Sequence, residues 1–139
     1  NLSYEHESGR LAAIDMLSVV VAKFPAEVIE AQWELLLMPL ISRLVNDPVP
    51  ACRREVGKVA GSLLTRLPRA CCDKLACFLE QWLTSDDADL RRTGAQVAAM
   101  LLQVERSAFK PRVQHLLPGL LTVLRRHVEM TLEEEGGER

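Results

Sequence analysis

A repeat with an offset of 39 residues is the sequence feature that most constrains how this chain folds. Leu40 and Leu44 recur as Leu79 and Leu83, and the match continues through the positions that follow. A self-similar unit of about this length is one supersecondary element, which buries its apolar face only against its neighbours. The other matched pairs are Asp47 with Asp86, Arg53 with Arg92, Val56 with Ala95, Val59 with Ala98 and Leu63 with Leu102.

Apolar residues within the unit recur every three or four positions, which is the spacing of one face of an α-helix. Leu36, Leu40 and Leu44 follow this spacing, and a second series begins at Val56 after a break at Pro48. Alternating strand patterns bounded by Asn-Gly or Asp-Gly turns are absent from the sequence. The expected fold is therefore all-α: an α-solenoid of HEAT-like or armadillo-like helical hairpins with about six helices.

Helix-breaking residues divide the chain at regular intervals. Pro25, Pro48, Pro68 and the polar run Ser85–Asp87 each end a helical pattern. We predict one repeat segment over residues 1–132, with helices at 3–24, 27–45, 49–66, 70–84, 87–105 and 109–132. The acidic residues 133–139, which include two glycines, are expected to form a flexible tail.

The two ends of the repeat segment carry half units. Arg10 and the apolar residues after it repeat the second helix of the unit, and Leu116–Leu120 repeats the first helix at Leu36–Leu40. We therefore expect a single second helix, two complete helix pairs and a single first helix, in that order. Pro39 and Pro118 fall within first helices, where a proline removes one backbone hydrogen bond and bends the helix.

Two acid–arginine pairs accompany the repeat and predict a structural ladder. Asp47 and Asp86 follow the first helix of each unit, where a carboxylate can accept hydrogen bonds from the free amides of the next helix. Arg53 and Arg92 lie about one turn into the second helix, within reach of the Asp of their own or the adjacent unit. The alternative is a functional charge site, but recurrence at one fixed offset favours the structural role.

Positive charge is concentrated in the last third of the chain. Residues 90–128 contain seven basic residues and one acid, Glu105, whereas residues 129–139 carry a net charge of −4. Basic side chains along a helix can contact the phosphates of a nucleic acid without reading its bases. A solvated helix face is the alternative, and the single aromatic residue here, Phe109, gives no support for base stacking. The candidate RNA or partner contacts are Arg106, Lys110, Arg112, Arg125 and Arg126.

Sequence patterns for catalysis and metal binding are absent. His115 and His127 are about 18 Å apart along one predicted helix and cannot share a substrate. The glycines form no phosphate-binding loop, and the longest uncharged runs are too short to cross a bilayer. We expect no enzyme activity, cofactor, metal site, small-molecule substrate or membrane segment. We interpret the four cysteines as small buried side chains of a protein from a reducing compartment: Cys52, Cys71, Cys72 and Cys77.

The N-terminal residues resemble one known family. Residues Asn1–Leu17, with Leu36–Asp47 as the next helix, are similar to the very large helical-repeat scaffold of the small-subunit processome, also called the "down-regulated in metastasis" family. The most specific positions of the resemblance are Asn1, Leu2, Glu5, Gly9, Arg10 and Leu11. The resemblance implies a non-enzymatic protein of the nucleolus and nucleus that supports pre-rRNA processing toward 18S rRNA. It also implies contacts with other processome proteins and with the small nucleolar ribonucleoprotein. Pre-rRNA or small nucleolar RNA, bound through phosphate contacts, is the further candidate partner. Because the chain begins with Asn1, we expect it to be part of a longer protein.

A second function stays open on the residues alone. Beyond the N-terminal stretch, the sequence has features common to many HEAT repeats. The alternative is therefore a generic HEAT-repeat protein-binding module, of the kind found in transport receptors or phosphatase scaffolds.

Overall fold

The computed structural model describes residues 6–137, which are helical apart from short connections. No strand occurs within this range, so the predicted all-α class is confirmed. The helices are α1 (Glu7–Lys23), α2 (Ala26–Asn46), α3 (Pro50–Arg66), α4 (Arg69–Leu83), α5 (Ala88–Glu105), the 3₁₀ turn η1 (Arg106–Phe109) and α6 (Lys110–Gly137).

Each predicted helix has a counterpart in the structure. Proline marks three of the helix starts: Pro25 and Pro68 directly precede α2 and α4, and Pro50 is the first residue of α3. The fixed φ of proline suits the first helical turn, where its missing N–H has no partner to lose. The start predicted at residue 3 lies outside the described residues.

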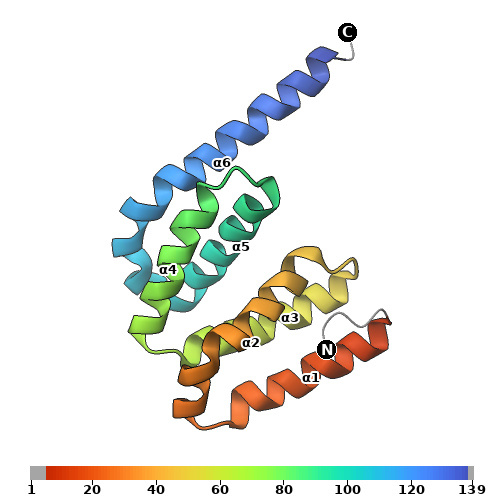
Figure 1. Cartoon of the computed structure of the whole chain (residues 1–139), viewed down its shortest axis with the longest axis vertical. Coiled ribbons are helices and arrows are strands. Elements are labelled where there is room, and N and C mark those ends of the chain that lie inside the picture. Colours follow the sequence, from red (N-terminus) through yellow and green to blue (C-terminus); the bar gives the residue numbers. More distant parts are fainter. Residues whose placement is uncertain (1–5, 138–139) are drawn as a thin grey trace.

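Helix α6 is longer than the sequence predicted. It continues past residue 132 through Glu133–Glu135 to Gly137, so the described part of the predicted flexible tail is helical. Glutamate is a good helix former, and no proline follows Pro118 in this stretch. Every residue from His127 to Gly137 is exposed, and this end of α6 projects from the rest of the molecule (Figure 1).

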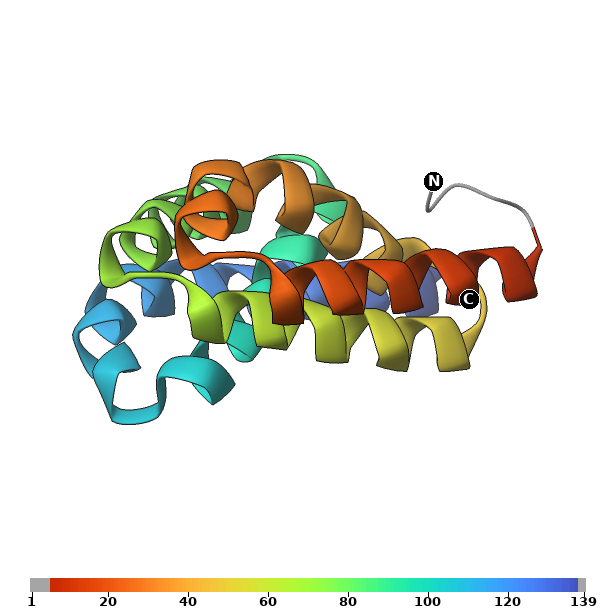
Figure 2. The same cartoon turned by 90° about the horizontal axis from the view of Figure 1, so that it is seen from below.

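The helices pack as consecutive hairpins. α2 lies against α3 and α4 lies against α5, each pair being joined by a short connection. α1 packs beside α3, α3 beside α5, and α6 beside α4. Figure 2 shows α1 and α3 side by side below α2 and α4. Within the described residues, α1 and α6 have no hairpin partner of their own.

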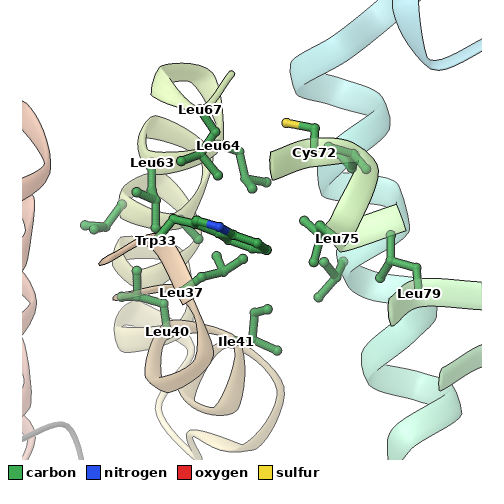
Figure 3. Close-up of a cluster of buried hydrophobic side chains, with 14 of the residues drawn as sticks. Trp33, Leu37, Leu40, Ile41, Leu63, Leu64, Leu67, Cys72, Leu75 and Leu79 are labelled. Carbon is green, nitrogen blue, oxygen red and sulfur yellow. The ribbon is translucent and has the colours of Figure 1, made fainter. Parts of the chain in front are cut away.

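A continuous hydrophobic core joins the two hairpins. Trp33, Leu37 and Ile41 of α2 are buried between α3 and α4, as Figure 3 shows. Burying a side chain of this size stabilises the fold by roughly 1.5–3 kcal/mol. The side chains that complete the junction are Leu63, Leu64 and Leu67 from α3 and its end, and Cys72, Leu75 and Leu79 from α4.

Candidate functional site

Asp47 anchors a buried polar cluster where α1 meets the turn between α2 and α3. Its carboxylate binds Arg10, with distances of 2.8 Å for Nε–Oδ2 and 3.3 Å for Nη2–Oδ1. The carboxylate also accepts the backbone N–H of Val49 at 2.9 Å, and the Asp47 carbonyl accepts Nη1 of Arg53 at 2.6 Å. Burial disfavours the charge on Arg10, but the hydrogen bonds and charge of Asp47 outweigh it and raise the pKa of the guanidinium. The cluster thus joins α1, the α2–α3 turn and α3.

Ser85 and Arg91 repeat this geometry in the second hairpin. Nη1 of Arg91 donates to the Ser85 carbonyl at 2.9 Å, six positions back, as Arg53 does to Asp47. The Ser85 hydroxyl accepts the N–H of Asp87 at 3.1 Å, two positions on, as the Asp47 carboxylate does with the second residue after it. The two turns are therefore equivalent at an offset of 38 residues.

The predicted pairing of Asp86 with Arg92 is wrong. The Asp86 side chain is fully exposed and lies 3.8 Å from Nη1 of Arg126. Arg92 is also exposed, and its Nη2 lies 3.5 Å from both Asn46 Oδ1 and Asp89 Oδ1. Neither residue takes the place that Asp47 or Arg53 has in the first hairpin.

A one-residue difference between the turns explains the change of offset. Leu40 and Leu79, which match at 39 positions, are both fully buried. Six positions separate Leu79 from Ser85, whereas seven separate Leu40 from Asp47. The second helices also follow the new offset, which aligns three pairs of buried residues: Val59 with Val97, Ala60 with Ala98 and Leu63 with Leu101.

Asp87, rather than Asp86, caps α5. Its carboxylate accepts the backbone N–H groups of Asp89 at 2.9 Å and Leu90 at 3.4 Å. The first amides of a helix have no partner within the helix, and a capping carboxylate provides one. A cap was predicted in this turn, but at Asp86 and not at Asp87.

Arg112 is buried in an ion-pair network and is not a surface contact. Its Nε and Nη2 bind the Glu105 carboxylate at 2.6 Å and 2.9 Å, and Nη2 also lies 2.9 Å from Asp73 Oδ1. The hydrogen bonds to Glu105 are the largest cause of a pKa for the guanidinium above its ordinary value. The network fixes the start of α6 to α4 and to the end of α5. Because Glu105 and Asp73 occupy its guanidinium, Arg112 is not available for the predicted contact with RNA.

The other four predicted basic contacts do not form one cluster. Arg106, Lys110 and Arg125 are exposed, but Arg125 lies about 22 Å from Lys110 along α6. Arg126 is half-buried beside Asp86. Arg106 ends α5 with a positive φ of 53°, where the chain enters η1. Contact of these separate charges with RNA stays a prediction.

A basic groove that the sequence analysis missed lies between α2, α3 and α5. Its volume is about 580 Å³, and Arg53, Arg54 and Gln96 provide its polar lining. The Asp47 carbonyl holds Arg53, whereas Arg54 is exposed and forms no hydrogen bond or ion pair within the described residues. Arg92 precedes Gln96 by one turn and so lies on the same side of α5. The signal in the sequence was the adjacent pair Arg53 and Arg54.

A second groove, between α1 and α2, is lined by apolar residues. Its volume is about 340 Å³. Two of its lining side chains are unusually open to solvent for their type, since Met16 is 71% and Leu35 is 74% exposed. The lining residues are Ala13, Met16, Leu17, Val20, Leu35, Leu36 and Pro39.

The four cysteines differ in how far their side chains are exposed to solvent. Cys52 and Cys72 are buried and Cys71 is half-buried, but Cys77 is exposed, so the interpretation that all four are buried is wrong. Burial is the main cause of a raised pKa for the thiols of Cys71 and Cys72. Cys77 lines an open groove between α4 and α6 that also includes His115.

Residues 6–137 contain no group of three or more His, Cys, Asp or Glu side chains that could hold a metal ion. Over the same residues, no helix combines the length and the apolar character needed to cross a membrane. No family model matches the chain.

Proposed function

We propose that this chain is a HEAT-like α-solenoid segment of a nucleolar small-subunit processome component. In this proposal it supports pre-rRNA processing toward 18S rRNA as a scaffold, without catalysing a reaction. Contacts between stacked repeats are local, so a solenoid gains binding surface with each repeat and needs no larger core. Its partners are other processome proteins, together with pre-rRNA or small nucleolar RNA.

The observation that carries the scaffold proposal is the recurrence of one turn geometry in successive hairpins. Arg53 binds the carbonyl of Asp47, and Arg91 binds the carbonyl of Ser85, each six positions back. Stacked repeats need each turn to be held in the same way, because each unit presents the same face to the next. The Arg10–Asp47 ion pair supports the same arrangement, since it connects α1 to the hairpin that follows.

The N-terminal resemblance supports the choice of the processome among scaffold assemblies. Arg10 belongs to the resembling stretch Asn1–Leu11 and is also the residue that binds Asp47. A residue of that stretch therefore connects α1 to the first hairpin. Residues 1–5 of the stretch lie outside the described residues.

In this proposal, the basic groove between α2, α3 and α5 makes the direct contacts with RNA phosphates. Arg54 is exposed there, with Arg53 and Arg92 nearby, and phosphate contacts need point charges rather than base-reading aromatics. Arg112 is excluded because its guanidinium is occupied by Glu105 and Asp73.

Crosslinking of the full-length protein in cells, followed by sequencing of attached RNA and identification of attached proteins, tests the proposal. We expect pre-18S rRNA sequences, small nucleolar RNA and small-subunit processome proteins among the crosslinked molecules. A protein outside the nucleolus that yields none of these would overturn the proposal.

The alternative is a generic HEAT-repeat protein-binding module. The repeated turns support it equally, because they carry the fold and not the partner. The same crosslinking experiment separates the two: transport cargo or a phosphatase catalytic subunit, in place of pre-ribosomal material, supports the alternative.

A further inference from the structure

The second helix of each hairpin carries a pair of adjacent arginines near its start. Arg53 and Arg54 of α3 match Arg91 and Arg92 of α5 at the offset of 38 residues that relates the two turns. The first arginine of each pair binds a turn carbonyl six positions back. The second arginine of each pair is exposed. Each repeat therefore uses one arginine to hold its turn and presents the other at the surface.

The two exposed arginines have little competition from acids of the chain itself. Arg54 forms no hydrogen bond or ion pair within the described residues. Nη2 of Arg92 lies 3.5 Å from Oδ1 of both Asn46 and Asp89, which is long for a hydrogen bond, and the Arg92 side chain is 53% exposed. An exposed ion pair of this kind contributes little free energy. Both guanidinium groups can therefore bind an external anion.

The basic groove between α2, α3 and α5 lies beside both exposed arginines. Arg54 lines the groove, and Arg92 reaches its rim at Asn46, the residue after the lining residue Val45. None of the described residues that line the groove is acidic. α3 packs beside α5, and the axes of packed helices are about 8–10 Å apart. One extended polyanion that crosses from α3 to α5 would therefore meet both guanidinium groups.

The rest of the groove lining is apolar, with one amide. Leu44, Val45 and Pro50 provide the apolar wall, and Gly57 has no side chain to fill the space. Gln96 is exposed and forms no hydrogen bond within the described residues. The groove volume of about 580 Å³ is in the range of pockets that hold small organic groups. A planar ring with an apolar face and a polar edge, such as a nucleobase, matches this lining.

We infer that the groove binds a single-stranded segment of RNA, with phosphates at Arg54 and Arg92 and one unpaired base between them against the apolar wall. The amide of Gln96 can both donate a hydrogen bond to the edge of that base and accept one from it. In a duplex the bases are paired and stacked, so a duplex offers its phosphates but no base that can enter the groove. This inference rests on the proposed function and adds that the RNA it contacts is unpaired.

Fluorescence anisotropy of the 139-residue chain tests the inference, with a labelled single-stranded RNA and with the same RNA annealed to its complement. We expect the single strand to bind more tightly than the duplex. Arg54→Glu and Arg92→Glu should each reduce the slope of log affinity against log salt by about 1, and the double variant by about 2. Arg125→Glu is the matched control, because it reverses the charge of an exposed arginine outside the groove.

Gly57→Met tests the base site without changing any charge. A Cβ atom at Gly57 meets Leu44 Cδ1 at 3.6 Å, an ordinary contact, so the helix accommodates the new side chain, which then occupies the groove. Gly61→Met is the matched control one turn further along α3, where nothing lies within 4 Å of the added atom. We expect Gly57→Met to weaken binding of the single strand roughly tenfold and to leave duplex binding nearly unchanged. Circular dichroism checks that the variants fold.

Two results would overturn the inference. Equal affinity for single-stranded and duplex RNA, or a Gly57→Met variant that binds the single strand as the unmodified chain does, would show that no base enters the groove. A salt slope that Arg92→Glu leaves unchanged would show that the RNA does not cross from α3 to α5.

The two proposals fail in different ways. If the purified chain shows no preference for single-stranded RNA while crosslinks to pre-ribosomal particles persist in cells, the base site is wrong and the proposed function stands. If the preference and its loss in Gly57→Met are found but no such crosslinks form, the base site stands and the proposed function is wrong.

Discussion

Arg10 and Asp47 lie 37 positions apart in the chain and form a buried, bidentate ion pair. The pair connects α1 to the turn that precedes α3, and so crosses the boundary between a single helix and a hairpin. Removing one partner of a buried pair leaves the other charge without compensation, which is strongly destabilising. Two aspartates that looked equivalent in the sequence, Asp47 and Asp86, therefore differ sharply in what they hold in place.

The first prediction compares these two aspartates. We expect Asp47→Ala to lower the free energy of unfolding by about 3 kcal/mol, because it removes a buried carboxylate and leaves Arg10 without its partner. Asp86→Ala changes it by less than about 0.5 kcal/mol, since its side chain is exposed. Asp87→Ala falls between them, at about 1 kcal/mol, through loss of the α5 cap. Urea unfolding monitored by circular dichroism measures all three, and equal losses for Asp47 and Asp86 would contradict the assignment.

The second prediction concerns the contact between α6 and α4. A Cβ atom at Gly119 would lie 2.8 Å from the Cβ of Leu83, which is fixed to the backbone and cannot move aside. We expect Gly119→Ala to destabilise the protein by about 1–3 kcal/mol through overpacking. Gly61 is the matched control: it is also helical, but nothing lies within 4 Å of the added atom. Gly61→Ala is expected to stabilise by up to about 1 kcal/mol through helix propensity, and thermal unfolding of both variants gives the comparison.

The third prediction separates the basic groove from the basic residues of α6. We expect Arg54→Glu to weaken binding of single-stranded RNA and to reduce the slope of log affinity against log salt by about 1. Arg125→Glu reverses the charge of an exposed arginine outside the groove and is expected to leave both nearly unchanged. Fluorescence anisotropy at several salt concentrations measures the two quantities. A loss with Arg125→Glu but not with Arg54→Glu would restore the α6 residues as the RNA contact.

The fourth prediction uses the cysteines as reporters of burial. A thiol reacts as the thiolate, so a buried thiol with a raised pKa reacts slowly and gains reactivity only at higher pH. We expect Cys77 to react rapidly with a maleimide near neutral pH, and Cys72 to react only when the chain unfolds. Because the folded state keeps the proton of Cys72 to a higher pH than the unfolded state does, this group also lowers stability as the pH rises above its ordinary pKa of 9.0. Mass spectrometry of the labelled protein identifies the modified sites, and rapid labelling of Cys72 in the folded chain would contradict its burial.

Periodicity was sufficient to predict the helices, because apolar spacing and proline position are local properties. Leu40 and Leu79 were correctly matched as core residues for the same reason. The offset of the second helices was not predictable from that match. It depends on how many residues the connecting turn uses, so the counterpart of the buried Leu63 is the buried Leu101 and not Leu102, which is 47% exposed.

The charged residues show a second limit of sequence reasoning. The count of positive charge gave Arg112 and Arg125 equal weight, but it contains no information on which acids lie nearby. Glu105 and Asp73 approach Arg112 from the end of α5 and from α4, and only the packing of those helices brings the three residues together. Arg54 was not predicted as a contact residue, because its groove is formed by three helices that are separate in the sequence.

The projecting end of α6 needs less free energy to unfold locally than the packed helices do. Over residues 127–137 every side chain of α6 is exposed and no other described helix shields its backbone hydrogen bonds, and an isolated helix end frays readily. Amide hydrogens there should exchange with deuterated solvent within seconds, long before those of α3.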